Sequence, residues 1–156
     1  MIKLVRVDHR LLHGQVAFSW TSSMAADCIL IANDEVLNDS LRKTTIKMAK
    51  PNGVKLVMKT VEDSIKAINS GVTDKYKLLI VVESIKDAYA LVKGCNQIQS
   101  INLGGTKAKE GTRNLSKAIN VLPEEEVLLK ELIGNGIEVE IRMVPDDNKV
   151  LAEKVL

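Results

Sequence analysis

Short apolar runs recur along the chain, separated by stretches whose apolar residues follow a helical period. The runs Cys28–Ala32 and Leu78–Val82 are nearly unbroken, which is typical of strands covered on both faces of a parallel sheet. The run Ile137–Arg142 instead alternates apolar and charged residues, which predicts a strand at a sheet edge with one solvated face. The six predicted strands are Ile2–Val7, Cys28–Ala32, Val54–Met58, Leu78–Val82, Ile98–Leu103 and Ile137–Arg142.

Three of the predicted helices carry clear start and stop signals. Thr60 and Ser84 stand where an N-cap side chain is favoured, and the helices that follow them end near Gly71 and Gly94. Pro123 precedes three glutamates and marks another helix start, since proline loses no needed hydrogen bond there and acidic residues favour the helix dipole.

Two further helices are predicted from periodicity. Leu37, Leu41, Thr44 and Met48 are spaced by four, three and four residues, so we expect this face to pack on the core. Trp20 shares a helical stripe with the apolar residues four positions before and after it, which predicts a partly buried core residue rather than a sugar-stacking platform.

The alternation of strands and helices predicts an α/β fold, with an open, doubly wound, twisted sheet and helices on both faces. The chain has 156 residues and shows no internal repeat or linker, so we expect one domain over residues 1–156. In such a fold ligands bind beyond the C-terminal ends of the strands.

Composition excludes several classes of function. The 22 basic and 20 acidic residues leave a formal charge of +2, and no basic run indicates a nucleic-acid interface. No apolar stretch is long enough to span a bilayer, and the start of the chain does not resemble a signal peptide. The two cysteines suggest neither a disulfide framework nor a metal site. These features predict a cytoplasmic protein without membrane insertion, metal or other cofactor.

Chemistry-bearing residues gather in the segment that follows the first strand. His13 is a candidate nucleophile, Arg10 a planar clamp for phosphate oxygens, and Asp8 a carboxylate able to orient an imidazole. Arg6 is a second candidate clamp, or else a solvent-facing side chain or the ion-pair partner of Asp8. His9 and His13 are four residues apart, but no third ligand accompanies them, which argues against a metal site. The residues alone favour an anion or phosphate site.

Glycines flank this segment in sequence and in the expected fold. Gly14 stands at the mouth of the following helix, where its backbone can approach an anion. Gly104, Gly105 and Thr106 follow the fifth strand; they either line a phosphate or form a tight turn. The right-handed winding of the chain brings this turn near the loop after the first strand, so we expect Gly104, Gly105 and Thr106 to line a phosphate.

The run Arg6-x-Asp8-x-Arg10-Leu11-x-His13-Gly14-Gln15-Val16 resembles the active-site signature of the IIB components of the mannose/fructose/sorbose family of bacterial sugar phosphotransferase systems. The resemblance extends along the chain in order. It continues at Trp20, Asn33-Asp34, Asn38-Asp39, Asn102–Gly105 and the Ile137–Arg142 strand. His9 stands where the family commonly has a second aspartate.

The resemblance implies a phosphotransferase that needs no nucleotide. His13 would accept a phosphoryl group on its δ nitrogen from a phosphohistidine of a IIA partner and pass it to a sugar held by the membrane IIC and IID components. Arg10 would stabilise the phosphoryl group, with Arg6 and Asp8 in support and Gly14 and Gln15 lining it. The implied sheet is mostly parallel with antiparallel strands at one edge, and the protein would be peripheral to the membrane through its partners.

Two other functions stay open from the residues. The first is nucleotide binding by a doubly wound fold, but this chain lacks the glycine-rich loop that such proteins have after the first strand. The second is a regulatory module that has lost its chemistry, which is less consistent with an intact His13. Leu11 and Leu12 are either core residues or contacts for IIA, and we expect at least one to be exposed. Lys107 and Lys109 are placed to steer an acidic partner surface.

Overall fold

A computed structural model describes all residues, 1–156, and its helices and strands alternate along most of the chain. The main elements are β1 (Ile2–Asp8), α1 (Gly14–Met24), β2 (Cys28–Ala32), α2 (Ser40–Ala49), β3 (Lys55–Lys59), α3 (Val61–Ser70), β4 (Leu78–Val82), α4 (Ile85–Gly94), β5 (Ser100–Gly105), α5 (Pro123–Gly134) and β8 (Glu138–Ile141). The smaller elements are η1 (Val36–Asn38), β6 (Arg113–Ser116), β7 (Ile119–Val121), β9 (Val150–Leu151) and η2 (Ala152–Lys154).

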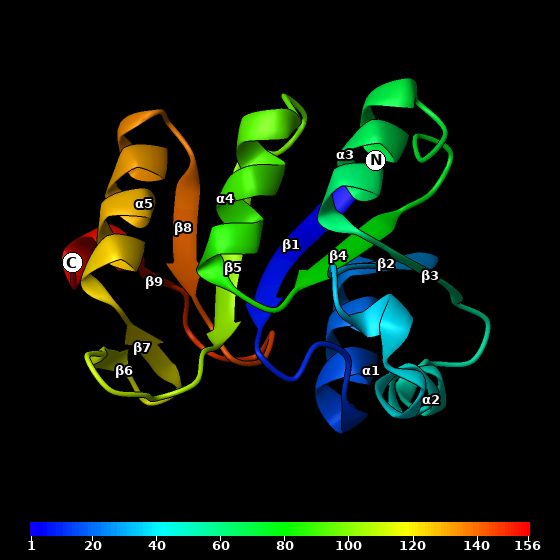
Figure 1. Ribbon diagram of the computed structural model, residues 1–156, viewed down its shortest axis with the longest axis horizontal. Helices are drawn as coiled ribbons and strands as arrows, with labels where there is room; N and C mark the ends of the chain where they lie inside the picture. The colour runs from blue at the N-terminus through cyan, green and yellow to red at the C-terminus, as the bar shows by residue number, and fades with distance from the viewer.

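One seven-stranded sheet in the order β3-β2-β4-β1-β5-β8-β9 runs through the molecule (Figure 1). All neighbouring strands are parallel except β8 and β9, which pair antiparallel at one edge. β6 and β7 form a separate antiparallel hairpin. The predicted mostly parallel sheet with an antiparallel edge is therefore confirmed. No helix has the length and apolar character needed to cross a membrane.

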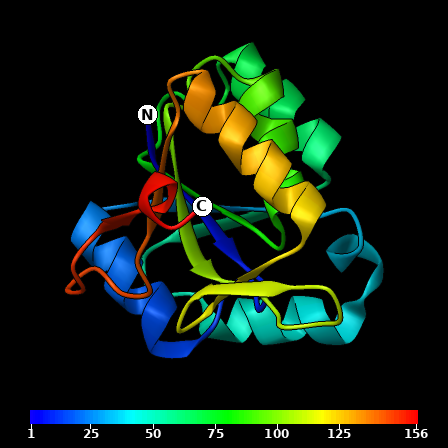
Figure 2. The ribbon, with the colours of Figure 1, turned by 90° about the vertical axis from the view of Figure 1, so that its left-hand side faces the viewer.

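Two apolar layers cover the two faces of the sheet because the side chains of each strand alternate between them. In β4, Leu78, Ile80 and Val82 pack in the layer with α3, α4 and α5, while Leu79 and Val81 pack in the layer with α1 and α2. Figure 2 shows the three helices on one side of the sheet and the other two on the opposite side. This placement leaves the loops beyond the strand ends free to build a site.

The predicted caps are present where the sequence placed them. The Thr60 hydroxyl accepts a hydrogen bond from the Asp63 N–H, and the Ser84 hydroxyl accepts one from the Asp87 N–H. Gly71 ends α3 in the left-handed conformation at φ 86°, where glycine carries no steric penalty. Local sequence therefore determines where these helices begin and end.

The orientation predicted for α2 is wrong, although the helix itself is confirmed. Leu41 and Met48 are exposed, and Ile46 is the buried residue of this helix. Thr44 and Thr45 also lie on the surface. Helix α2 packs on the layer with α1 through Ile46, and the more regular apolar stripe faces solvent.

The predicted sheet edge also needs correction. β8 pairs with β5 on one side and with β9 on the other, so the edge strand is β9. Glu140 is buried at 6% exposure instead of lying on a wet face, and its carboxylate pairs with Arg142 Nε at 3.2 Å. The hairpin β6–β7 and the short β9 were not predicted, because strands of two to four residues carry almost no periodic signal.

Candidate active site

The loop between β1 and α1 is anchored at the C-terminal ends of the central strands. The His9 N–H donates to the Gly105 carbonyl at 3.0 Å, which fixes the loop against the end of β5. A second bond, from the Leu11 N–H to the Asp8 carbonyl at 2.9 Å, closes a tight turn. The candidate residues therefore meet where ligands bind in open α/β sheets.

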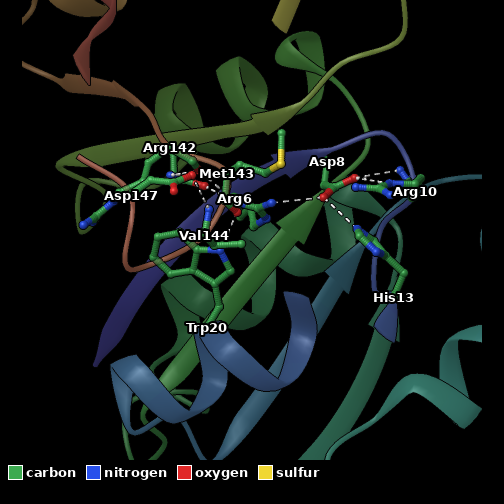
Figure 3. Close-up of polar contacts among 10 residues, drawn as sticks. Arg6, Asp8, Arg10, His13, Trp20, Arg142, Met143, Val144 and Asp147 are labelled. Carbon is green, nitrogen blue, oxygen red and sulfur yellow. Dashed lines mark hydrogen bonds and ion pairs between the residues drawn. The ribbon is translucent and has the colours of Figure 1, made fainter. Parts of the chain in front are cut away.

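Asp8 is the centre of the site, and its side chain is completely buried. Its Oδ2 accepts hydrogen bonds from Arg6 Nη2 at 3.2 Å and from His13 Nε2 at 3.0 Å. Its Oδ1 accepts the backbone N–H of Arg10 at 3.0 Å and lies 3.5 Å from Arg10 Nε. Figure 3 shows Arg6 on one side of this carboxylate and Arg10 and His13 on the other. The structure thus brings together the four residues predicted to be catalytic.

These contacts keep Asp8 ionised. Burial alone raises the pKa of the Asp8 carboxyl, because a charged group loses hydration. The hydrogen bonds from His13 and from the Arg10 N–H, together with the charge of Arg6, outweigh burial and leave the pKa below its ordinary value. The carboxylate is therefore a fixed negative charge beside the His13 ring.

His13 presents one ring nitrogen for chemistry. Because Nε2 binds the Asp8 carboxylate, the proton of the neutral ring is on Nε2 and the lone pair is on Nδ1. The side chain is 23% exposed, so a reactant can reach it. His13 is also the N-cap residue of α1, and neither its side chain nor an acidic residue caps the first turn. The unpaired N–H groups there and the helix dipole favour an anion.

Gly14 is the first residue of α1 and has a φ of 40°, a backbone conformation that favours glycine. No neighbouring atom lies within 4 Å of the position that a Cβ would take, so backbone conformation and not crowding explains glycine here. Gln15 follows on the exposed first turn. Their predicted phosphate-lining role stays a prediction.

Arg6 is buried and not solvent-facing; the predicted ion pair with Asp8 is present. Its Nη1 donates to Asn102 Oδ1 at 2.7 Å and to the Arg142 carbonyl at 3.2 Å. The guanidinium also lies over the ring of Trp20, 5.4 Å from its centroid. Burial lowers the pKa of Arg6, and Asp8 offsets part of this effect. Arg6 therefore positions Asp8 from inside the protein.

The side-chain network around Arg6 continues to the loop after β8. Trp20 is a core residue as predicted, although at 1% exposure it is buried more deeply than expected, and its indole N–H donates to the Met143 carbonyl at 3.1 Å. Arg142 stacks over the same ring at 5.2 Å (Figure 3). Helix α1, whose N-cap residue is His13, is thereby tied to the loop after β8.

Gly104 and Gly105 also have structural roles that the sequence did not predict. A Cβ on Gly104 would overlap the Arg6 guanidinium, so this glycine makes room for the buried arginine. Gly105 ends β5 and its carbonyl holds the His9 N–H. The Thr106 N–H donates to the Ala118 carbonyl and its hydroxyl to the Asn120 carbonyl, so both donors are used within the protein. These contacts account for the residues structurally, and the predicted phosphate-lining role of Gly104, Gly105 and Thr106 stays a prediction.

The expectation that Leu11 or Leu12 is exposed is wrong. Their exposures are 2% and 3%, and both pack in the layer with α1 and α2. Leu11 has a φ of 59°, a strained conformation for a bulky residue. Burial of the two leucines holds the loop in this shape, so they are core residues.

His9 lines a cleft that does not include His13 among its lining residues. This polar cleft has a volume of about 300 Å³ and is also lined by Lys107, Lys109, Glu83 and Glu125. Both lysines are exposed, as steering of an acidic partner requires. Histidine, cysteine, aspartate and glutamate side chains form no group of three suited to a metal ion.

Two further side chains, Asn102 and Arg42, shape the site without having been predicted to do so. Asn102 is fully buried in an apolar strand, and a polar residue in such a run was the available signal. Arg42, on α2, reaches the carbonyl of His9 at 3.3 Å. Nothing in its helical pattern distinguishes it from a solvated arginine.

Comparison with known families and structures gives one consistent result. Residues 2–156 match the family model described as the PTS system sorbose subfamily IIB component. The crystal structure of the IIBSor domain of the sorbose permease from Klebsiella pneumoniae superposes with a TM-score of 0.90 at 30% identity, covering 96% of this chain and 92% of that one.

Curated relatives agree with this match. A probable phosphotransferase enzyme IIB component of Streptococcus pyogenes is 35% identical, and the match covers 96% of this chain and 96% of that one. The sorbose-specific EIIB component of Lacticaseibacillus casei is 33% identical, with 94% of this chain and 90% of that one covered. The mannose-specific EIIAB component of Escherichia coli is also 33% identical, but this chain covers only 46% of its length.

Proposed function

We propose, because this chain belongs to the sorbose subfamily of IIB components of phosphotransferase systems, that His13 carries a phosphoryl group between two partners. The donor is a phosphohistidine of a IIA protein or domain, and the acceptor is a sugar held by membrane IIC and IID components. The observation that carries the proposal is the hydrogen bond between His13 Nε2 and the buried Asp8, which leaves Nδ1 as the nucleophile.

In the first step the Nδ1 lone pair of His13 attacks phosphorus, and the phosphorus–nitrogen bond of the donor breaks. The donor ring leaves with the bonding electron pair, as neutral imidazole when its other nitrogen holds a proton. His13 then carries the phosphoryl group on Nδ1 and a proton on Nε2, so its ring is cationic. The adjacent Asp8 carboxylate, 3.0 Å from Nε2, stabilises this cation.

Positive groups beside His13 stabilise the negative charge of the phosphoryl group during transfer. Arg10 has a half-exposed side chain beside Asp8, close enough to the surface to turn toward phosphate oxygens. The first turn of α1, with Gly14 and Gln15, adds backbone N–H groups at the positive end of the helix dipole. Phosphoryl transfer depends mainly on such positioning and charge stabilisation.

In the second step a sugar hydroxyl attacks phosphorus, and the hydroxyl proton passes to solvent water. The bond from phosphorus to Nδ1 breaks, and its electron pair returns to His13 as the neutral ring with a proton on Nε2. No nucleotide is consumed, because the phosphohistidine is itself the activated donor. The E. coli relative named as an EIIAB component supports a IIA partner. We place the protein in the cytoplasm, peripheral to the membrane through its partners.

The test is phosphoryl labelling of the intact protein, measured by mass spectrometry. The protein is incubated with phosphoenolpyruvate, the general phosphotransfer proteins and IIA. We expect one phosphoryl group on the wild type, none on His13→Ala and nearly normal labelling of His9→Ala. Labelling that survives in the His13→Ala protein would refute the assignment. Normal folding of each variant is checked by circular dichroism.

A further inference from the structure

The ends of three adjacent strands meet in one polar network beside the active-site loop. His9 follows β1, Asn33 follows β2 and Glu83 follows β4. Since β4 lies between β2 and β1 in the sheet, Glu83 lies between the other two residues. Asn33 Nδ2 donates to Glu83 Oε2 at 2.8 Å. A hydrogen-bond donor that reached both Glu83 and the His9 carbonyl would therefore link the loop backbone to the centre of the sheet.

Arg42 is that donor. Its Nη1 pairs with Glu83 Oε2 at 2.9 Å, and its Nη2 donates to the His9 carbonyl at 3.3 Å. The Arg42 side chain is only 28% exposed. Its position on α2 is fixed because the Arg42 N–H donates to the N-cap residue Asp39. The planar guanidinium spans two acceptors at once, which a lysine ammonium on a flexible stem does less well.

Asn33 holds the other end of this network rigid. It is 4% exposed, and its Oδ1 accepts hydrogen bonds from the N–H groups of Glu35 and Val36 at 3.0 and 2.9 Å. Its side chain is therefore fixed at both ends, and Glu83 cannot move without breaking a bond to it. Glu83 also neutralises Arg42 in a region where Asp34 and Asp87 add negative charge.

The loop needs such support because its own conformation is strained. Leu11, two residues after His9, has a φ of 59°, which is unfavourable for leucine. Asp8 fixes the loop from inside the protein through the Arg10 N–H and His13. Arg42 contacts the same loop from α2, at the carbonyl next to Asp8. This contact adds to the His9 N–H bond to Gly105 and to the burial of Leu11 and Leu12, and its loss loosens the turn that sets the direction of the His13 ring.

We propose that Arg42, held by Glu83 and Asn33, is a positioning residue that orients the active-site loop for phosphorylation of His13. The proposal rests on the proposed function, since its main readout is transfer to His13. Arg42 acts through the His9 carbonyl and touches neither the His13 ring nor Asp8 in this structure. It differs from a docking residue because its effect does not require a protein partner.

The experiment uses phosphoramidate, a small phosphoryl donor that removes partner docking from the measurement. Rates of His13 phosphorylation are followed by mass spectrometry over a range of donor concentrations. Arg42→Gln and Glu83→Gln are compared singly and together. The matched control is Arg113→Gln, because Arg113 likewise bridges a carboxylate, Glu126, and a backbone carbonyl, that of Val155.

We expect Arg42→Gln to lower the maximal rate about tenfold, with the half-saturating donor concentration unchanged. Glu83→Gln should give a similar loss, and the double variant should be no slower than Arg42→Gln alone. Arg113→Gln should keep the wild-type rate. A rate for Arg42→Gln within about twofold of wild type overturns the proposal. So does a defect seen only with a protein donor, because that result assigns Arg42 to docking.

A second readout needs no phosphoryl transfer. Amide hydrogen exchange of residues 9–12 should quicken in Arg42→Gln and stay unchanged in Arg113→Gln. Unchanged exchange in Arg42→Gln overturns the proposal. If wild type is not phosphorylated by either donor, the proposed function fails, and exchange alone then decides whether Arg42 holds the loop.

Discussion

Replacing Asp8 with asparagine removes one charge while keeping the shape of the side chain. Asp8 offers two acceptor oxygens, and both face donors: Arg6 and His13 at Oδ2, and the Arg10 N–H at Oδ1. Asparagine has one acceptor oxygen, so its NH₂ group must face a donor in either orientation. At least one buried hydrogen bond is lost, and Arg6 loses its counter-ion.

The stability cost follows from these contacts. Removing one partner of a buried ion pair costs about 3–5 kcal/mol, because the other charge is left without compensation. Arg6 keeps its bonds to Asn102 and to the Arg142 carbonyl, which places Asp8→Asn at the lower end, about 3 kcal/mol. The cationic ring of phosphorylated His13 loses its counter-ion as well. We expect phosphorylation to slow at least about 100-fold, or about 2.7 kcal/mol.

The pH dependence of the stability loss in Asp8→Asn gives a sharper test than the size of that loss. The pKa of Asp8 is depressed in the folded protein, so its stabilising effect is complete above its ordinary value of 3.8. The effect is lost as the pH falls through the folded-state pKa, below 3.8. The difference in unfolding free energy between wild type and Asp8→Asn should therefore be largest near neutral pH and shrink below about pH 4.

Urea unfolding followed by circular dichroism at several pH values measures this difference. Asp39→Asn is the matched control, because Asp39 is an exposed N-cap and asparagine caps a helix equally well. A difference for Asp8→Asn that is equal at pH 7 and well below pH 4 would show that Asp8 is not ionised in the fold. Wild-type phosphorylation in Asp8→Asn would refute its role in orienting His13.

Further predictions concern Arg10, Gly104 and the lysines near the cleft. Arg10→Lys keeps the charge but loses the planar fork, so transfer to His13 should slow about 10- to 1,000-fold in single-turnover labelling; a rate within about twofold would show that only charge matters. Gly104→Ala forces Arg6 to move and should cost about 1–3 kcal/mol in urea unfolding, and unchanged stability would contradict the packing role. Phosphorylation by subsaturating IIA should slow as salt rises toward physiological strength, where screening reaches about 8 Å; a salt-independent rate would exclude steering by Lys107 and Lys109.

Much of this protein is determined by sequence alone because the relevant interactions are local. The periods of the apolar runs indicate the six main strands, and the caps at Thr60 and Ser84 are contacts over three residues. The segment around His13 can also be recognised from sequence, since its chemistry-bearing residues are close together in the chain. Asp8, Arg10 and His13 need only one turn of the chain to meet.

The tertiary structure decides what depends on contacts between distant segments. Arg6 meets Asn102 across 96 residues and Trp20 meets Met143 across 123, so neither contact appears in any local pattern. Helix α2 is buried through Ile46, which packs with residues of α1 and β4, and this leaves Leu41 and Met48 exposed despite their regular spacing. The position of Arg42 in its helical pattern is that of a solvent-exposed residue. It contacts Glu83 and the His9 carbonyl only because three strand ends converge beside it. Periodicity fixes which element forms, whereas packing selects the face and the partners of each side chain.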